Sequence, residues 1–257
     1  MAVAVEKICD PALFSLEEAI EYAKAGARDT PGFELAIVRF LQTLYGSRHL
    51  HLPALFRTFD VLGGILAGGH KDQVRLIALV RPFLRSSDPQ IVSKCVLLIG
   101  RQSQSMAWVS SVMSESDERI RANLIESLWN RREDEVVQIL KSALADPHPR
   151  VAANAVYGLY LAGNEAWIPG LARLTGDPSP AFRRSGIWVI KASGLPDAPA
   201  RIKTLIHDPD PEIRRAAFNA LIHVRDANAR SKPGPPADPS PVQTTPGALE
   251  SAKAATT

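Results

Sequence analysis

The residues of this sequence that could bind a metal or catalyse a reaction are few and widely spaced. His49 and His51 stand two residues apart and could offer two metal ligands, but no cysteine or further histidine lies close enough in the sequence to complete a set. His148 occupies an expected helix start, and His207 an expected helix end, where a positive side chain interacts favourably with the helix dipole. We therefore predict no metal and no cofactor.

A glycine-rich segment at residues 63–72 has part of the spacing of a phosphate-binding loop. Gly64 and Gly69 have the required separation, but His70 stands where the motif needs a lysine, and the residues after it supply no hydroxyl for a metal ion. We interpret the segment as a flexible turn between two helices. Because no nucleophile, base and orienting group occur with compatible spacing elsewhere, the sequence predicts that the protein is not an enzyme.

The composition favours packed helices and gives little support for nucleic-acid binding. Apolar residues make up 46% of the 257 residues and aromatic residues only 6%, which fits helix packing better than a β-rich fold. The net charge of +3 is too small to indicate a polyanion partner. Cys9 and Cys95 are far apart, which fits structural thiols in a reducing compartment better than a disulfide framework. Without a signal-peptide pattern or a long apolar window, we expect a soluble, cytoplasmic protein.

A repeat of 31 residues organises most of the chain. The segments that begin at Asp146, Asp177 and Asp208 align without a gap, and each starts with the pattern Asp-Pro-x-Pro. Two earlier copies are centred on Ile91 and Ile120. A fixed period of this length indicates a solenoid, in which each copy packs against its neighbours.

Each copy is predicted to form two helices, and the Asp-Pro-x-Pro pattern marks the start of the second. Proline fits the first helical position because its missing N–H would be unpaired there, and Asp or Ser side chains accept hydrogen bonds from the free amides of the first turn. The five expected N-cap residues are Asp88, Asp117, His148, Ser179 and Asp210. Gly163 and Gly194 are expected to end two of these helices.

This unit resembles the HEAT repeat, especially the short bacterial kind also found in phycobilin-lyase-type (PBS-lyase) proteins. The resemblance rests on second-helix sequences such as DPDPEIRRAAFNAL at residues 208–221, and it covers five copies over residues 72–225. It implies an all-α fold, a right-handed α-solenoid of helical hairpins whose second helices line the concave side. It also implies a structural ladder of Asp and Arg side chains that links adjacent repeats. Here the ladder would consist of Asp146, Asp177, Asp208, Arg121, Arg183 and Arg214.

Residues 1–71 and 226–257 do not keep the period. The first segment is expected to be a helical N-terminal region of degenerate repeats that cap the solenoid, with Ser15 and Glu18 as a capping box at the start of one helix. The second segment is rich in proline and poor in large apolar residues, so we expect a disordered tail. Within it, residues 233–241 could alternatively form a polyproline ligand for another protein.

Helical geometry sorts each second helix into a core face and an opposite face. In the last copy Ile213, Ala217, Ala220 and Leu221 fall on the core face. The opposite column carries Trp129, Tyr157, Tyr160, Arg184, Trp188, Lys191, Arg215 and Asn219. Because Trp, Tyr and Arg dominate binding hot spots, we interpret this column as a binding surface. The alternative is that curvature presses the helices together and the aromatic residues pack on one another.

The sequence thus predicts a non-enzymatic HEAT-repeat scaffold or adaptor that binds a protein or peptide on its concave face, with the basic residues selecting acidic groups. Two alternatives stay open: a nucleic-acid binder that stacks bases on the aromatic residues, and an enzyme of the chromophore-lyase kind. Glu126 interrupts the column, which argues against nucleic acid. The HEAT-like enzyme deoxyhypusine hydroxylase holds iron with His-Glu pairs. This sequence contains no His-Glu dipeptide, so the resemblance to that enzyme ends at the fold.

Overall fold

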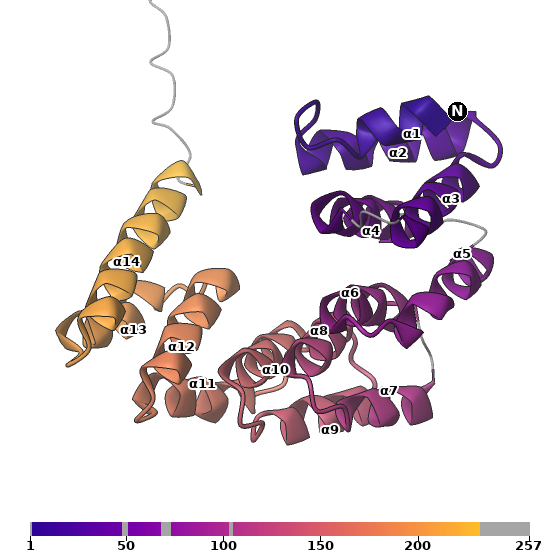
Figure 1. Cartoon of the computed structure of the whole chain (residues 1–257). Helices are drawn as coiled ribbons and strands as arrows, with labels where there is room; N and C mark the ends of the chain where they lie inside the picture. The colour runs from indigo at the N-terminus through magenta and orange to yellow at the C-terminus, as the bar shows by residue number, and fades with distance from the viewer. Residues whose placement is uncertain (1, 48–50, 68–72, 103–104, 232–257) are drawn as a thin grey trace, which may run out of the picture.

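The computed structural model describes residues 2–47, 51–67, 73–102 and 105–231, and every regular element in these ranges is helical (Figure 1). The α-helices are α1 (Ala2–Ile8), α2 (Leu16–Asp29), α3 (Phe33–Gly46), α4 (Leu52–Ala67), α5 (Gln73–Val80), α6 (Pro89–Gly100), α7 (Met106–Met113), α8 (Glu118–Ser127), α9 (Asp134–Ala143), α10 (Pro149–Leu161), α11 (Trp167–Gly176), α12 (Pro180–Ser193), α13 (Ala198–Lys203) and α14 (Pro211–Ser231). Two 3₁₀ helices, η1 (Arg81–Arg85) and η2 (Thr204–His207), extend α5 and α13. Among the described residues, no helix is long and apolar enough to cross a membrane.

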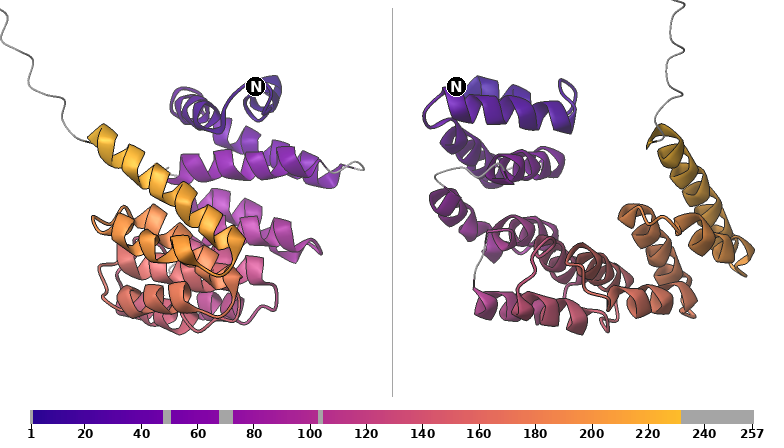
Figure 2. Two further views of the ribbon diagram at one scale, coloured as in Figure 1. Left: turned by 90° about the vertical axis from the view of Figure 1, so that its left-hand side faces the viewer. Right: turned by 180° about the vertical axis from the view of Figure 1, so that it is seen from behind.

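The helices form two rows that curve into an arc, and the predicted all-α solenoid is confirmed (Figure 1). The even-numbered helices form the inner row, in which each helix from α2 to α12 packs against the next even-numbered one. The odd-numbered helices form the outer row on the convex side. Seen from behind, the indigo α2 and the yellow α14 again lie at opposite ends of the arc (Figure 2, right).

The inner helices of the repeats begin at the residues that the Asp-Pro-x-Pro pattern predicts. The Asp88, Asp117 and Asp210 side chains accept hydrogen bonds from backbone amides in the first turn, at 2.7 to 2.9 Å. Ser179 and His148 occupy the N-cap positions of α12 and α10 as predicted, but neither side chain makes a capping hydrogen bond. The first Asp of the pattern, two residues before the N-cap, makes a hydrogen bond to the backbone there: the Asp177 carboxylate accepts the amide of Ser179 at 2.8 Å.

The same turn recurs at two other repeats, where the Asp146 and Asp208 carboxylates accept the amides of residues 148 and 210 at 2.8 and 2.9 Å. This geometry fixes the entry of the chain into each inner helix, as Asp does in turns by bonding the backbone two residues on. At the other end, Gly163 and Gly194 adopt positive φ angles of 73° and 60° after α10 and α12. These are the two stop positions that the sequence predicts.

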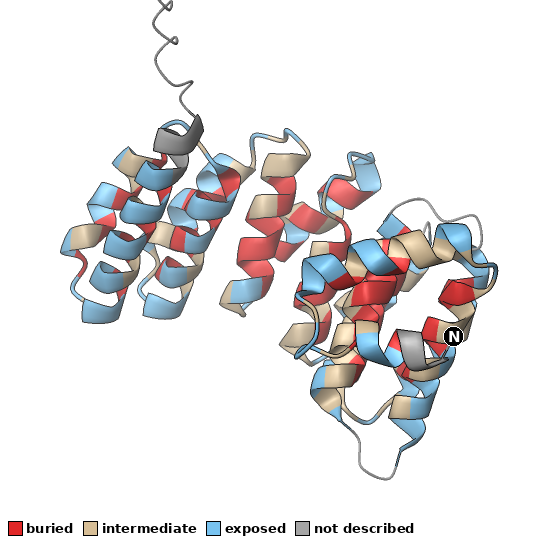
Figure 3. Cartoon of the chain, turned by 90° about the horizontal axis from the view of Figure 1, so that it is seen from above, coloured by how far each residue is buried: buried red, intermediate tan, exposed pale blue. Residues whose placement is uncertain are grey.

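The core runs without a break along the whole arc. Three clusters of buried apolar residues follow one another, and neighbouring clusters share inner helices α6 and α10. In α14, Ile213 and Ala217 are fully buried and Ala220 is 1% exposed, as the helical arc predicts. Figure 3 shows buried residues in every part of the row. Each helix pair therefore depends on its neighbours to bury its apolar faces.

The four N-terminal helices occupy further places in the same two rows. Inner helix α4 packs between α2 and α6, and the Lys94 ammonium in α6 contacts both carboxylate oxygens of Asp60 in α4 at 2.7 and 3.0 Å. Ser15 and Glu18 form the expected capping box at the start of α2. At the other end, the expected boundary at residue 225 falls inside α14, which continues to Ser231. Residues 232–257, including the candidate polyproline segment, lie outside the described residues.

Candidate binding surface on the inner row

Every member of the candidate column lies on the inner row. Tyr157 and Tyr160 belong to α10, and Trp129 lies two residues beyond the end of α8. The remaining members lie on the last two inner helices, namely Arg184, Trp188 and Lys191 on α12 and Arg215 and Asn219 on α14. The thirty-one-residue period therefore brings residues from four repeats onto one side of the solenoid, because the inner helices start in register.

The four aromatic side chains of the column form one continuous cluster. The Trp129 ring lies 4.8 Å from Tyr157 and 6.2 Å from Trp188, measured between ring centroids. Tyr157 lies 5.6 Å from Trp188 and 6.2 Å from Tyr160. These separations are typical of edge-to-face and offset-stacked pairs, each of which contributes about 0.5–1.5 kcal/mol beyond burial of surface. We call these four residues, with Trp167, the aromatic cluster.

Trp167, at the start of outer helix α11, is the member that sequence analysis missed. Its ring meets Tyr160 edge to face at 5.5 Å, and the guanidinium of Arg201 lies 5.5 Å from the Trp167 ring centroid. Trp167 belongs to a first helix of the repeat, so a search restricted to the second helices could not find it. The cluster therefore joins the outer and inner rows as well as three inner helices.

Two members of the cluster are held by hydrogen bonds to the backbone of the next inner helix. The indole N–H of Trp129 donates to the carbonyl of Asn154 in α10 at 2.9 Å. The Tyr160 hydroxyl donates to the carbonyl of Ser193 in α12 at 2.7 Å. Gly158 allows the close approach, because a Cβ at this position would lie 3.0 Å from Cδ1 of Trp129. Trp129 and Tyr160 therefore brace adjacent helices.

The solvent-exposed part of the column lies on α12 and α14. Trp188 is 41% exposed although it packs on Trp129 and Tyr157, whereas those two side chains are only partly exposed. Lys191 and Asn219 are exposed. Ile222, one turn beyond Asn219, is 46% exposed and occupies the repeat position of Lys191. We call Trp188, Lys191, Asn219 and Ile222 the exposed inner patch.

The two arginines of the column already have a carboxylate neighbour. Glu212 accepts a hydrogen bond from Arg215, and its other carboxylate oxygen lies 3.8 Å from the guanidinium of Arg184. All three side chains are exposed, so these ion pairs contribute little to stability. No carboxylate of the described residues lies within ion-pair distance of Lys191. The exposed inner patch and the two arginines beside it thus present three basic groups and one acidic group, Glu212.

The structure brings four of the six candidate ladder residues together as two bidentate ion pairs. Arg121 contacts the Asp146 carboxylate at 2.9 and 3.1 Å, and Arg183 contacts Asp208 at 2.7 and 2.8 Å. Arg183 lowers the pKa of Asp208, chiefly through the hydrogen bond between the two side chains. Each arginine also donates to two carbonyls of the loop before its own helix, at 2.8 Å.

Asp177 and Arg214 do not form such pairs among the described residues. The arginine position one repeat before Asp177 is occupied by Ala152, which is 1% exposed. Arg214 keeps the two carbonyl contacts, at 2.8 and 2.9 Å, without the acidic partner.

A second connection between inner helices, which the sequence analysis missed, uses buried asparagine side chains. The Asn154 side chain donates to the carbonyl of Ala122 in α8 at 2.9 Å. Asn123 donates in the same way to the preceding inner helix at 3.0 Å.

The residues considered for metal or phosphate chemistry do not form a site in the described part of the chain. No group of three His, Cys, Asp or Glu side chains there could hold a metal ion. His49 and most of the glycine-rich loop, residues 68–72, lie outside the described residues. His51 accepts the amide of Ala54 at 3.2 Å in the first turn of α4. Burial raises the pKa of both free thiols, that of Cys95 to about 12, so neither is a reactive thiolate.

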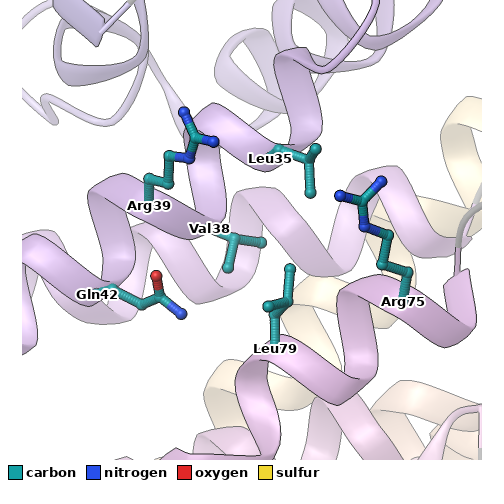
Figure 4. Close-up of a pocket in the computed structure, with 6 residues that line it drawn as sticks. All are labelled: Leu35, Val38, Arg39, Gln42, Arg75 and Leu79. Carbon is teal, nitrogen blue, oxygen red and sulfur yellow. The ribbon is translucent and has the colours of Figure 1, made fainter.

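A small cavity of about 150 Å³ lies between the outer helices α3 and α5 (Figure 4). Leu35, Val38 and Leu79 form its apolar part, and Arg39, Arg75 and Gln42 surround them. None of these lining residues is a nucleophile, a general base at neutral pH or a typical metal ligand. The cavity is on the opposite row from the candidate column and supplies no catalytic group.

Comparison with known proteins identifies the repeats. A family model described as HEAT repeats matches residues 105–186 and 168–232. A search of curated proteins gives no match. Among solved structures, the chain is similar to human deoxyhypusine hydroxylase in complex with glycerol, at 14% identity over 88% of this chain and 96% of that one, with a TM-score of 0.37. It is also similar to a designed armadillo repeat protein in complex with the peptide (KR)4, at 15% identity over 87% and 98%, with a TM-score of 0.29.

One functional prediction needs correction after these comparisons. The prediction that the chain is not an enzyme is wrong as stated, because an enzyme, deoxyhypusine hydroxylase, is among the structures that it resembles. The absence of a recognisable motif is no basis for excluding catalysis, because one fold can host many unrelated functions. At such low identity the similarity concerns the fold, and it assigns no activity to this chain.

Proposed function

We propose, from the premise that this chain belongs to the HEAT-repeat family, that its inner row binds a segment of a protein or peptide partner, with the exposed inner patch as the centre of contact. The observation that carries the proposal is the exposure of Trp188, which stays 41% exposed on an inner helix although two aromatic residues of the column, Trp129 and Tyr157, pack on it. Solenoids of this kind use their extended concave surfaces for binding. We place the protein in a reducing compartment such as the cytoplasm, in keeping with its two free thiols.

Trp188 has the properties of a binding anchor. Its indole stacks on Trp129 and meets Tyr157 edge to face, so its position is fixed before a partner arrives. Little side-chain entropy is then lost on binding, which favours affinity. The exposed Ile222 on α14 extends the apolar surface. Tryptophan in a partly formed apolar surrounding is a common hot spot in protein interfaces.

The charges around the patch favour a partner segment that combines an apolar side chain with a carboxylate. Lys191 on α12 is exposed without an acidic partner in the described residues, and Arg184 and Arg215 share the single carboxylate of Glu212. A carboxylate on the partner could pair with Lys191 without displacing an existing ion pair. Such exposed charges act mainly on association rate and selectivity.

A peptide-display selection on the full chain tests this chemistry. We expect the selected peptides to contain an aromatic or aliphatic residue near Asp or Glu, and to bind at least about fivefold more weakly to the Lys191→Glu variant. Charge reversal there replaces attraction by repulsion across the interface. Lys203→Glu, on outer helix α13, is the matched control and should bind like the unaltered chain. Equal weakening by both substitutions would remove the argument for the patch.

A further inference from the structure

The last inner helix leaves one edge uncovered that is buried in every earlier repeat. Phe218 in α14 is 59% exposed, whereas the residues at the same repeat position, Ile187, Val156 and Ile125, are at most 3% exposed. Those three lie on α12, α10 and α8, each of which has a further inner helix packed against it. Among the described elements, α14 packs against α12, α13 and η2, and no later inner helix follows it. A large apolar side chain thus stands where a further layer would cover it.

Arg214 on the same helix has half of the contacts that its counterparts make. Like Arg121 and Arg183, it donates to two carbonyls of the loop before its helix. Those two arginines also bind an aspartate 25 residues further along the chain, Asp146 and Asp208 respectively. The Arg121 and Arg183 side chains are 12% and 10% exposed. Arg214, by contrast, is exposed and lacks an acidic partner in the described residues. The next aspartate of the ladder is therefore missing from the end of the row.

The chain supplies a matching sequence directly after α14. Residues 238–241 read Asp-Pro-Ser-Pro, which is identical to residues 177–180 at the start of α12. Asp238 follows Asp208 by 30 residues and Arg214 by 24, one fewer in each case than within the repeats. This is the position along the chain at which a sixth copy of the pattern would stand, although the segment between lacks the apolar residues of an outer helix.

We propose that the edge of α14 formed by Arg214 and Phe218 binds the chain's own segment at residues 238–241, with the Asp238 carboxylate on the Arg214 guanidinium and the prolines over the Phe218 ring. The contact completes the ladder and closes the open end of the solenoid, which otherwise exposes an apolar stacking face. It needs no outer helix, because the carboxylate and the proline rings are the parts that contact the inner helix. The segment acts as a terminal cap.

The connecting chain is long enough for this contact. Arg214 lies 17 residues before Ser231, so the two are separated by roughly 26 Å along the α14 axis. The seven steps from residue 231 to Asp238 span up to about 23–25 Å when extended. The Arg214 side chain reaches over the remaining distance, and Phe218 is one turn nearer to Ser231. The segment would therefore run back along α14, antiparallel to it.

Site-specific photo-crosslinking in the full chain tests the proposal. Placing p-benzoylphenylalanine at position 218 keeps an aromatic side chain where Phe218 is already exposed. We expect illumination to join residue 218 to the tryptic peptide that spans residues 231–253. Asp238→Asn and Arg214→Gln should each lower the yield at least about threefold, because either removes the ion pair. Glu250→Gln, which removes another carboxylate of the same segment, is the matched control and should leave the yield unchanged.

Three results would overturn the proposal. The first is the absence of any cross-link to residues 231–253. The second is a yield that Asp238→Asn does not change, since the carboxylate would then play no part. The third is a cross-link between different copies, recognised in a mixture of isotope-labelled and unlabelled chains and by a yield that rises with concentration. In that case a second copy covers the edge of α14.

Discussion

The Asp208 carboxylate stabilises the structure in two ways, through a backbone turn and through an ion pair with Arg183. It accepts the amide of residue 210 and so shapes the turn before α14, and it forms a bidentate ion pair with Arg183 of the preceding repeat. The side chain is 4% exposed. Removing one partner of such a pair leaves the other charge buried, which destabilises more than the pair itself stabilises. The spacing of Asp-Pro-x-Pro thus encodes a link between repeats as well as a helix start.

The Arg183–Asp208 pair should make stability depend on pH in the acid range. The pKa of Asp208 in the folded state lies below its value in the unfolded chain. The carboxylate therefore stabilises the fold above about pH 4, and this contribution is lost as the pH falls through the folded pKa. Urea unfolding between pH 3 and pH 7 should show that Asp208→Asn is less stable than the unaltered chain at pH 6 and that the difference shrinks on acidification.

The matched control is Glu165→Gln, which removes an exposed carboxylate from the loop before α11. If the difference between Asp208→Asn and the unaltered chain is the same at pH 3 as at pH 6, the ion pair does not carry the stabilisation.

At the scale of elements, close contacts between inner helices depend on small residues at fixed places. Gly100 in α6 faces Ser127 at the end of α8 so closely that a Cβ at position 100 would lie 2.6 Å from the Ser127 Cβ. Gly158 serves the same purpose between α10 and Trp129. Helices in contact over such residues cannot separate without uncovering the cores that they share. These glycines therefore set the spacing of the inner row.

Gly100→Ala should destabilise the protein by about 1–3 kcal/mol, because the added methyl group forces α6 and α8 apart. That cost exceeds the gain from replacing glycine by alanine, which is roughly 0.5–1 kcal/mol in a helix interior and no larger at Gly100, the last residue of α6. Urea unfolding at neutral pH measures the difference. Gly176→Ala in α11, where a Cβ would meet no atom within 4 Å, is the control and should be neutral or slightly stabilising. Equal stability of the two variants would contradict this account of the α6–α8 contact.

The sequence predicted where the helices begin and end more fully than it predicted the contacts between them. The starts of the inner helices and the two glycine stops could be predicted, because caps and breakers act locally. The place of Trp167 in the aromatic cluster could not, since it depends on how the outer row packs on the inner row. Nor could the hydrogen bond from Trp129 to Asn154, which depends on how neighbouring inner helices pack. The pairing of Arg184 in α12 with Glu212 in α14 also depends on a neighbouring helix. Both interpretations of the aromatic column thus have support: Trp129 and Tyr160 brace helices, and Trp188 is exposed.

At the scale of the whole molecule, the arc is one continuous stack from α2 to α14. The period disappears from the sequence before residue 72, yet α2 and α4 extend the inner row, and Lys94 ties α4 to α6. Outer helix α3 has 14 residues, whereas the outer helices α7, α9, α11 and α13 of the repeats have at most 10, so the apolar residues there no longer recur at 31 residues. A one-dimensional stack of this kind presents a rigid inner surface built from many repeats.

The measurement that tests the central claim most directly is the affinity of the full chain for a display-selected peptide, by calorimetric titration, with alanine at Trp188. The account predicts at least about tenfold weaker binding for Trp188→Ala, as expected for a hot-spot tryptophan. Ile168→Ala is the matched control, because Ile168 is 44% exposed on outer helix α11, and it should bind like the unaltered chain. Unchanged affinity in Trp188→Ala would contradict the assignment of the exposed inner patch as the binding surface.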